Sequence, residues 1–178
     1  MKNIIRILIK IAERIYARID PEKYIRHIGV NCRGKVSIYG NPYGHFGTEP
    51  WIITIGDNVH ITKEVEFITH DGGTLIFRSQ YPRLEITKPI HVGDNVYIGV
   101  RSIILPGVTI GSNVIIGAGS VVTKDIPDNS VAAGVPARVI KCSEEYLNKI
   151  KRESLEIGDF SGKEKDKALR KIYGHKKG

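Results

Sequence analysis

The 178-residue sequence has few of the residues that mark several classes of protein. Its two cysteines, Cys32 and Cys142, lie far apart, and nothing suggests a disulfide framework. We therefore expect a reduced, cytosolic protein in which both cysteines pack. No apolar run is long enough to span a bilayer, and charges such as Arg6 and Lys10 interrupt the N-terminal apolar stretch. That interruption argues against a signal peptide.

Acidic residues are also few relative to basic ones. The chain has 19 Asp and Glu against 27 Lys and Arg, a formal net charge of +8. The basic residues concentrate in residues 1–33 and 141–178. No nucleic-acid-binding motif accompanies them, so we expect no nucleic-acid partner and assign a few of these cations to a polyanionic small ligand.

What the chain does contain is a six-residue period over residues 86–127. The first position of each hexad is aliphatic: Ile86, Val92, Ile98, Ile104, Ile110, Ile116 and Val122. The fifth position is small or β-branched: Ile90, Val96, Ser102, Val108, Val114, Ser120 and Ile126. This period fits neither a helix nor an alternating strand, and it predicts an all-β parallel β-helix with both positions facing inward. The alternative is a β-sandwich in which the six-residue spacing is accidental. Because all seven first positions are aliphatic, we disfavour that alternative.

The same register appears upstream at Ile55, Ile61 and Phe67 and is interrupted once, by residues 71–85. Long loops that leave a regular frame are usually functional or disordered. We interpret this excursion as functional.

Segments of other character flank the coil, and we divide the chain into residues 1–27, 28–141 and 142–178. An amphipathic helix is expected over residues 2–19, ended by Asp20-Pro21 and followed by a linker up to residue 27. It either caps the open end of the coil, the interpretation we favour, or lies on a membrane surface. A second helix is expected from Glu144 to about Ile157, ended by Gly158, and the basic tail is either helical or frayed.

Two runs in the second block carry a resemblance: IGDNVYIG, and ILPGVTIGSNVIIGAGSVVTKDIPDNSVAAGVPARVIK. They resemble the hexapeptide-repeat acyltransferases, in the branch of galactoside and maltose O-acetyltransferases and of capsular and lipopolysaccharide sugar O-acetyltransferases. The resemblance covers about residues 28–141. It implies a left-handed parallel β-helix, a homotrimer with active sites between subunits, and acetyl transfer from acetyl-CoA to a hydroxyl of a sugar or surface glycan precursor.

The resemblance also implies a catalytic histidine at the start of the excursion, where this chain reads Thr69-His70-Asp71. Histidine suits the general base that a hydroxyl needs as it attacks a thioester directly, in a ternary complex. The alternative is a corner histidine satisfied by backbone. Glu49 and Asp71 are the candidate acceptor-binding residues, although Glu49 could be an ordinary loop carboxylate and Asp71 could instead orient His70.

The residues implied in acetyl-CoA binding lie in the second block. They are Tyr97, Gly99, Gly117, Ala118, Thr123, Lys124, Arg138 and Lys141. Small residues would let the pantetheine arm approach the backbone, and the cations would pair with phosphates. The alternative for the glycines is that a hexapeptide coil needs them anyway.

Other functions remain open at this point. The related γ-class carbonic anhydrases bind zinc through three histidines, but His60, His70 and His91 are spaced differently, so we predict no metal and interpret His60 and His91 as surface residues. Another acceptor, such as serine, an aminosugar nucleotide or a xenobiotic hydroxyl, is one alternative. A non-enzymatic scaffold with basic ends, touching a partner or the inner membrane surface, is the other.

Overall fold

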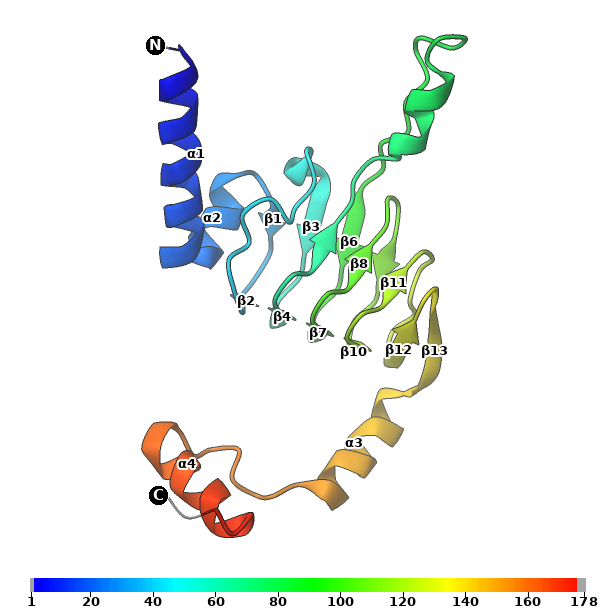
Figure 1. Cartoon of the computed structure of the whole chain (residues 1–178). Coiled ribbons are helices and arrows are strands. Elements are labelled where there is room, and N and C mark those ends of the chain that lie inside the picture. The colour runs from blue at the N-terminus through cyan, green and yellow to red at the C-terminus, as the bar shows by residue number, and fades with distance from the viewer. Residues whose placement is uncertain (1, 176–178) are drawn as a thin grey trace. The chain divides into compact units, whose positions relative to one another are not determined.

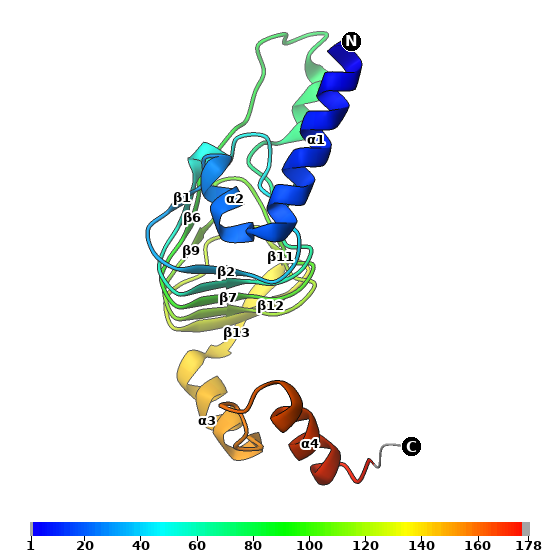
Figure 2. The same ribbon diagram turned by 90° about the vertical axis from the view of Figure 1, so that its left-hand side faces the viewer.

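The computed structural model describes residues 2–175 and separates into two compact units, Met1–Ser143 and Glu144–Gly178. The first unit holds a coil of short strands preceded by two helices (Figures 1 and 2). Each unit is described by itself below.

The strands form three sheets that are the three faces of a coil. The first sheet contains β1 (Asn31–Cys32), β3 (Ile53–Ile55), β6 (Ile90–Val92) and β9 (Thr109–Ile110). The second contains β2 (Val36–Ile38), β4 (Val59–Ile61), β7 (Val96–Ile98), β10 (Val114–Ile116), β12 (Ser130–Gly134) and β13 (Ala137–Cys142), and the third contains β5 (Glu66–Phe67), β8 (Ile103–Ile104) and β11 (Val121–Val122). From β3 to β11, successive strands visit the three sheets in turn, and every pair of neighbouring strands is parallel except β12 with β13. The predicted parallel β-helix is therefore confirmed (Figure 1).

The interior follows the hexad pattern with one exception. First positions from Val92 to Val122 and the aliphatic fifth positions are buried. The hydroxyls of the buried fifth-position serines are satisfied, as Ser102 Oγ donates to Gly99 O at 2.8 Å and Ser120 Oγ to Gly117 O at 2.6 Å. Ile86 was expected inside but is 38% exposed, because the chain rejoins the coil only at β6.

Asparagines mark the corner between the first and second sheets. Asn58, Asn95, Asn113 and Asn129 stack there with φ between 52° and 57°, a left-handed conformation that asparagine tolerates. Each side-chain amide donates to the next Oδ1, at 2.9, 3.2 and 2.9 Å. This ladder ties successive turns together along the coil axis.

The N-terminal cap differs from the expectation. Helix α1 (Lys2–Ile19) has the predicted bounds, but a second helix, α2 (Pro21–His27), replaces the expected linker. The Asp20 carboxylate caps α2 by accepting from Lys23 N at 3.1 Å. Tyr24 and Ile25 of α2 are buried, whereas nearly all apolar residues of α1 are exposed. Most of the cap at this end of the coil is therefore α2, and α1, which we expected to form the cap, adds only Ala17 and the partly buried Tyr16.

The C-terminal segment is helical. Helix α3 (Ser143–Glu153) ends earlier than the expected end near Ile157. The tail that follows, which could have been helical or frayed, forms helix α4 (Gly162–Ile172). Residues 176–178 of the predicted basic tail lie outside the described residues. Cys142, expected to pack, is exposed, whereas Cys32 is half-buried, and burial raises the pKa of its thiol.

Candidate active site

The excursion leaves the coil at the corner between the third and first sheets. We call this corner, residues 68–70, 105–108 and 123–125, the excursion corner. The neck of the excursion is closed by backbone bonds, from Asp71 N to Ile86 O and from Lys88 N to Thr69 O, both 2.9 Å. His70 itself pairs with Thr87 in an antiparallel bridge. A 3-10 helix, Gly72–Phe77, begins the excursion, so His70 is held between the coil and this helix.

The ring of His70 contacts a carboxylate from another part of the chain. Its Nδ1 lies 3.3 Å from Glu49 Oε2 and 3.2 Å from Thr48 Oγ1. Glu49 precedes the short 3-10 helix Pro50–Ile52, in an irregular segment that is bonded to β5 of the third sheet from Phe67 N to His45 O at 2.8 Å. The side chain of His70 remains 39% exposed. The histidine is thus fixed through one nitrogen while part of its ring faces open space.

Glu49 is itself held by three donors. Its two oxygens accept from Thr48 Oγ1 and from the buried Thr69 Oγ1, each at 2.5 Å, in addition to the His70 contact. These bonds, led by the one from Thr48, lower the pKa of the Glu49 carboxyl below its usual value. A charged acceptor at Nδ1 favours the tautomer that carries its proton there, which leaves the lone pair on Nε2.

Glu49 has a contact that the sequence did not predict. Its carboxylate is engaged by His70 and two threonines, and it also lines a hollow beside His70, so acceptor binding by Glu49 stays a prediction. Asp71, the other candidate, does not orient the histidine through any described bond, because its Oδ1 accepts from Gly73 N at 2.9 Å and caps the 3-10 helix. Asp71 is exposed and remains placed to meet a ligand.

Two hollows meet at His70. The first has a volume of about 510 Å³ and runs along the excursion corner past Lys88 and Leu105 to Thr123. The second, about 470 Å³, lies on the excursion side and is lined by polar groups that include Glu49, Arg78 and Glu85. His70, Asp71 and Gly72 line both. The histidine therefore lies between two spaces, each large enough for part of a small-molecule substrate.

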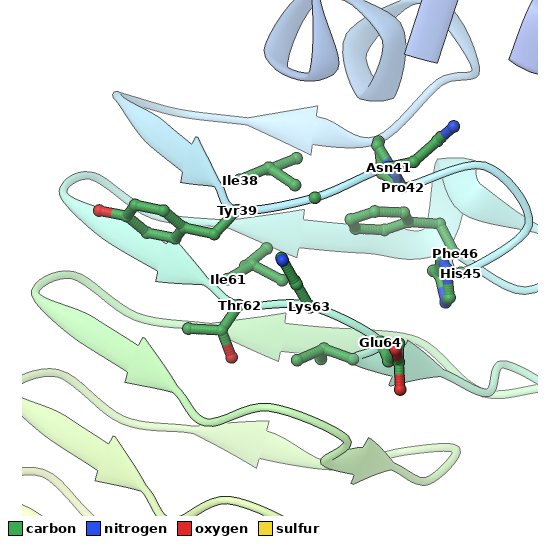
Figure 3. Close-up of a pocket in the computed structure, with 12 residues that line it drawn as sticks. Ile38, Tyr39, Asn41, Pro42, His45, Phe46, Ile61, Thr62, Lys63 and Glu64 are labelled. Atoms are coloured by element: carbon green, nitrogen blue, oxygen red, sulfur yellow. The ribbon is translucent and has the colours of Figure 1, made fainter. Parts of the chain in front are cut away.

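A third hollow, drawn in Figure 3, is too small for a substrate. It lies between Ile38–Pro42 and the next turn at Ile61–Glu64, and its accessible volume is about 10 Å³, room for one water molecule (Figure 3). His45 at its edge is paired with Glu66, Nδ1 to Oε1, at 2.6 Å.

The residues expected to bind acetyl-CoA divide between two corners and one sheet. Thr123 and Lys124 are exposed at the excursion corner, and Thr123 lines the first hollow. Gly117 and Ala118 lie at the corner between the second and third sheets, which we call the glycine corner (residues 62–65, 99–102 and 117–120). The structure thus brings Thr123 to His70, but it leaves the glycine-corner residues at the other edge of the third sheet.

The remaining predicted cofactor residues lie on the second sheet, except Gly99, which is a buried residue of the glycine corner. Tyr97 is exposed on β7, opposite His60 and Ile115. Arg138 and Lys141 lie on β13. Gly99 is buried, and a Cβ there would lie 2.5 Å from Ala118 N, so close packing between turns accounts for this glycine. The contact of Gly99 with acetyl-CoA stays a prediction.

Sequence reasoning missed three residues of the site. Thr48 and Thr69 hold Glu49, and Lys88 places a cation beside the first hollow. Thr69 was visible as the neighbour of His70, but nothing in the hexad pattern singles out Thr48 or Lys88.

The other coil histidines do not join the site. His60 was expected on the surface but is half-buried, with Nδ1 2.9 Å from Tyr39 Oη and its ring stacked on that tyrosine. His91 is exposed, as expected. Among residues 2–175, no group of three His, Cys, Asp or Glu side chains is placed to hold a metal ion.

The chain is similar to a known family and to individual known proteins. The pattern of the bacterial transferase hexapeptide family (six repeats) matches residues 89–124. Protein CapG of Staphylococcus aureus is 47% identical over 154 residues, which cover 86% of this chain and 87% of that protein. The galactoside O-acetyltransferase of Escherichia coli K12 is 42% identical over 128 residues, 70% of this chain and 60% of the enzyme.

A solved structure shares the fold. A galactoside acetyltransferase in complex with coenzyme A superposes with a TM-score of 0.52 at 32% identity, covering 80% of this chain and 76% of that one. Together with the repeat, the extent of these matches shows the family. This chain belongs to the hexapeptide-repeat acyltransferases and is an acyltransferase.

Proposed function

We propose that this enzyme transfers the acetyl group of acetyl-CoA directly to a hydroxyl of a sugar or surface glycan precursor, with His70 as general base. The observation that carries the proposal is the position of His70 between two hollows, with Nδ1 held by Glu49. Direct transfer requires a base that lies between the two substrates, because the base must reach the acceptor hydroxyl while the thioester lies beside that hydroxyl.

In this mechanism, His70 Nε2 takes the hydroxyl proton as the acceptor oxygen attacks the thioester carbonyl carbon. The tetrahedral intermediate collapses by breaking the carbon–sulfur bond, and His70 returns its proton to the departing thiolate. Glu49 acts through His70 as a positioning residue, since its carboxylate fixes the ring and stabilises the imidazolium that forms. No acyl-enzyme is needed.

The acetyl donor is assigned to the first hollow. Lys88 and Lys124 would lie near a polyanionic ligand there, and Thr123 contributes a hydroxyl. A relative of this chain was solved with coenzyme A, which supports the same cosubstrate here. We predict no bound metal.

The division of the predicted donor residues between two corners supports a homotrimer with sites between subunits. In one chain, the third sheet separates the excursion corner from the glycine corner. A neighbouring copy could place its Gly117 and Ala118, with Tyr97, opposite the excursion corner of the first. The resemblance likewise favours a trimer and a left-handed coil, and the two cysteines without a disulfide framework favour a cytoplasmic enzyme.

The acceptor is assigned to the second hollow. Asp71, Arg78 and Glu85 offer it both acceptors and donors for hydroxyl groups, and Arg78 and Glu85 are paired with each other across the excursion. A ring with several hydroxyls suits such a lining. The name of the galactoside O-acetyltransferase relative supports a sugar.

The proposal is tested by following thiol release from acetyl-CoA in the presence of a panel of hydroxyl acceptors. The panel contains galactosides, maltose, capsule and lipopolysaccharide sugars, serine and an aminosugar nucleotide. We expect release that depends on a sugar. Release with serine alone would change the acceptor class, and failure to bind acetyl-CoA by calorimetry would remove the transferase mechanism proposed here.

A further inference from the structure

Helix α1 exposes an apolar face that no other described residue of the first unit covers. The face spans about half of the helix circumference. Its members are Ile4, Ile5, Leu8, Ile9, Ile11, Ala12, Ile15 and Ile19. Leu8 is 59% exposed, Ile15 53% and Ile19 77%, whereas Ala17 is the buried residue of this helix.

The opposite face of α1 is basic. Arg6, Lys10, Arg14 and Arg18 are exposed there, and Glu13 is the helix's only acidic residue. An apolar face beside a strongly cationic one is typical of helices that lie in a membrane interface. Within the described part of the chain, no helix is long and apolar enough to cross a bilayer.

Contacts at its C-terminal end hold α1 in a fixed position next to the coil. Tyr16 packs edge-on against Tyr24 of α2, with the ring centroids 5.9 Å apart, and Asn41 Nδ2 donates to Arg14 O at 3.2 Å. From there α1 extends away from the turns, and its N-terminal end lies farthest from them (Figures 1 and 2). The apolar face is thus held out from the coil.

We propose that α1 docks this enzyme on an anionic lipid surface. The apolar face would enter the headgroup region, and the four cations would meet lipid phosphates and carboxylates. A second copy fits the face less well, because the face is wider than the narrow seam through which two helices of a coiled coil pack.

The direct test is flotation of the full-length enzyme with vesicles of phosphatidylcholine alone or with about one third phosphatidylglycerol. Wild type is expected to float with the anionic vesicles and poorly with the neutral ones. The variant Leu8→Gln with Ile15→Gln should weaken anionic-vesicle binding at least about tenfold, because two aliphatic groups that would enter the lipid are lost. Both positions are exposed in the first unit, so the fold should persist.

A matched control makes the same chemical change elsewhere. Leu155→Gln with Ile172→Gln alters two aliphatic residues of the C-terminal unit that are 42% and 47% exposed. This control should float like wild type. Equal loss in the control would assign the membrane contact to the C-terminal unit and overturn the proposal.

The charge contribution is tested separately. Arg6→Gln with Lys10→Gln should weaken binding to anionic vesicles by roughly fivefold per charge. The same loss of charge in α4, Lys163→Gln with Lys167→Gln, should have little effect. The basic-face prediction is contradicted if the two pairs behave alike.

Other outcomes also overturn the proposal. If wild type does not float, or if Leu8→Gln with Ile15→Gln floats normally, α1 is not a lipid-docking helix. If that variant instead lowers the mass measured by sedimentation velocity, the face contacts a second copy. Flotation requires no catalysis, so its result stands apart from the proposed function.

Discussion

At the scale of single residues, the site depends on one contact that joins distant parts of the chain. His70 could be predicted from its place at the end of a hexad and from the Thr69-His70-Asp71 resemblance. Its partner Glu49 is 21 residues earlier, in a segment with no period, so no spacing rule connects the two. The sequence therefore predicted His70 as the candidate base, whereas the orientation of its ring required the folded coordinates.

Glu49→Gln is expected to lower kcat by 10- to 100-fold, in the range roughly seen when a carboxylate partner of a functional histidine is removed. The amide cannot stabilise the imidazolium, but it leaves both hollows in place. The KM for acetyl-CoA should therefore change little. Steady-state kinetics on the preferred acceptor separates the two parameters.

Glu22→Gln is the control for this variant, because Glu22 pairs with Arg26 on α2, away from the site. It should keep wild-type kcat. A purely structural role for Glu49 would be indicated if Glu49→Gln raised KM and lowered the unfolding temperature without a specific loss of kcat.

At the scale of structural elements, the six-residue period predicted the coil because burial repeats with it. Every first position from Val92 to Val122 is buried, but Ile86 follows the same spacing and is not. The period marks which positions can face inward, whereas the point where the excursion rejoins the coil depends on bonds at its neck. The second helix, α2, was missed for a related reason, since seven residues after a proline carry little periodic signal.

Ile104 and Ile86 both occupy first positions of hexads but differ in burial, so the same substitution can be compared at the two sites. Ile104→Ala removes a fully buried side chain and should lower the free energy of unfolding by about 2 to 5 kcal/mol. Ile86→Ala makes the same change at a site 38% exposed and should cost clearly less. Urea unfolding of both variants measures the difference, and equal losses would contradict the placement of Ile86 outside the core.

At the scale of the whole molecule, the proposed function extends beyond one chain. The residues expected around acetyl-CoA fall at two corners with a sheet between them, and only the excursion corner carries His70. Sequence reasoning grouped these residues by resemblance, but it could not show that one chain keeps them apart. Sequence reasoning also favoured α1 as the helix that caps the coil. The end of the coil must be covered, but this requirement does not tell which of two adjacent helices covers it.

Subunit mixing tests the shared site. His70→Ala disables one corner, and Ala118→Trp, at an exposed position, would block the other. Each homotrimer should be inactive, while equal mixtures assembled at random should recover about a quarter of wild-type activity, because that fraction of interfaces pairs two intact corners. If both variants still assemble and their mixtures remain inactive, the whole site lies within one chain.

The most direct test of the account is the rate of thiol release from acetyl-CoA with a saturating sugar acceptor, for wild type, His70→Ala and His91→Ala. His91 is an exposed histidine of the same coil, so its replacement controls for the loss of an imidazole. The account predicts that His70→Ala loses acceptor-dependent release by at least about 100-fold, the lower range for general-base catalysis, while His91→Ala retains it. Undiminished release by His70→Ala would contradict the assignment of the base and the mechanism built on it.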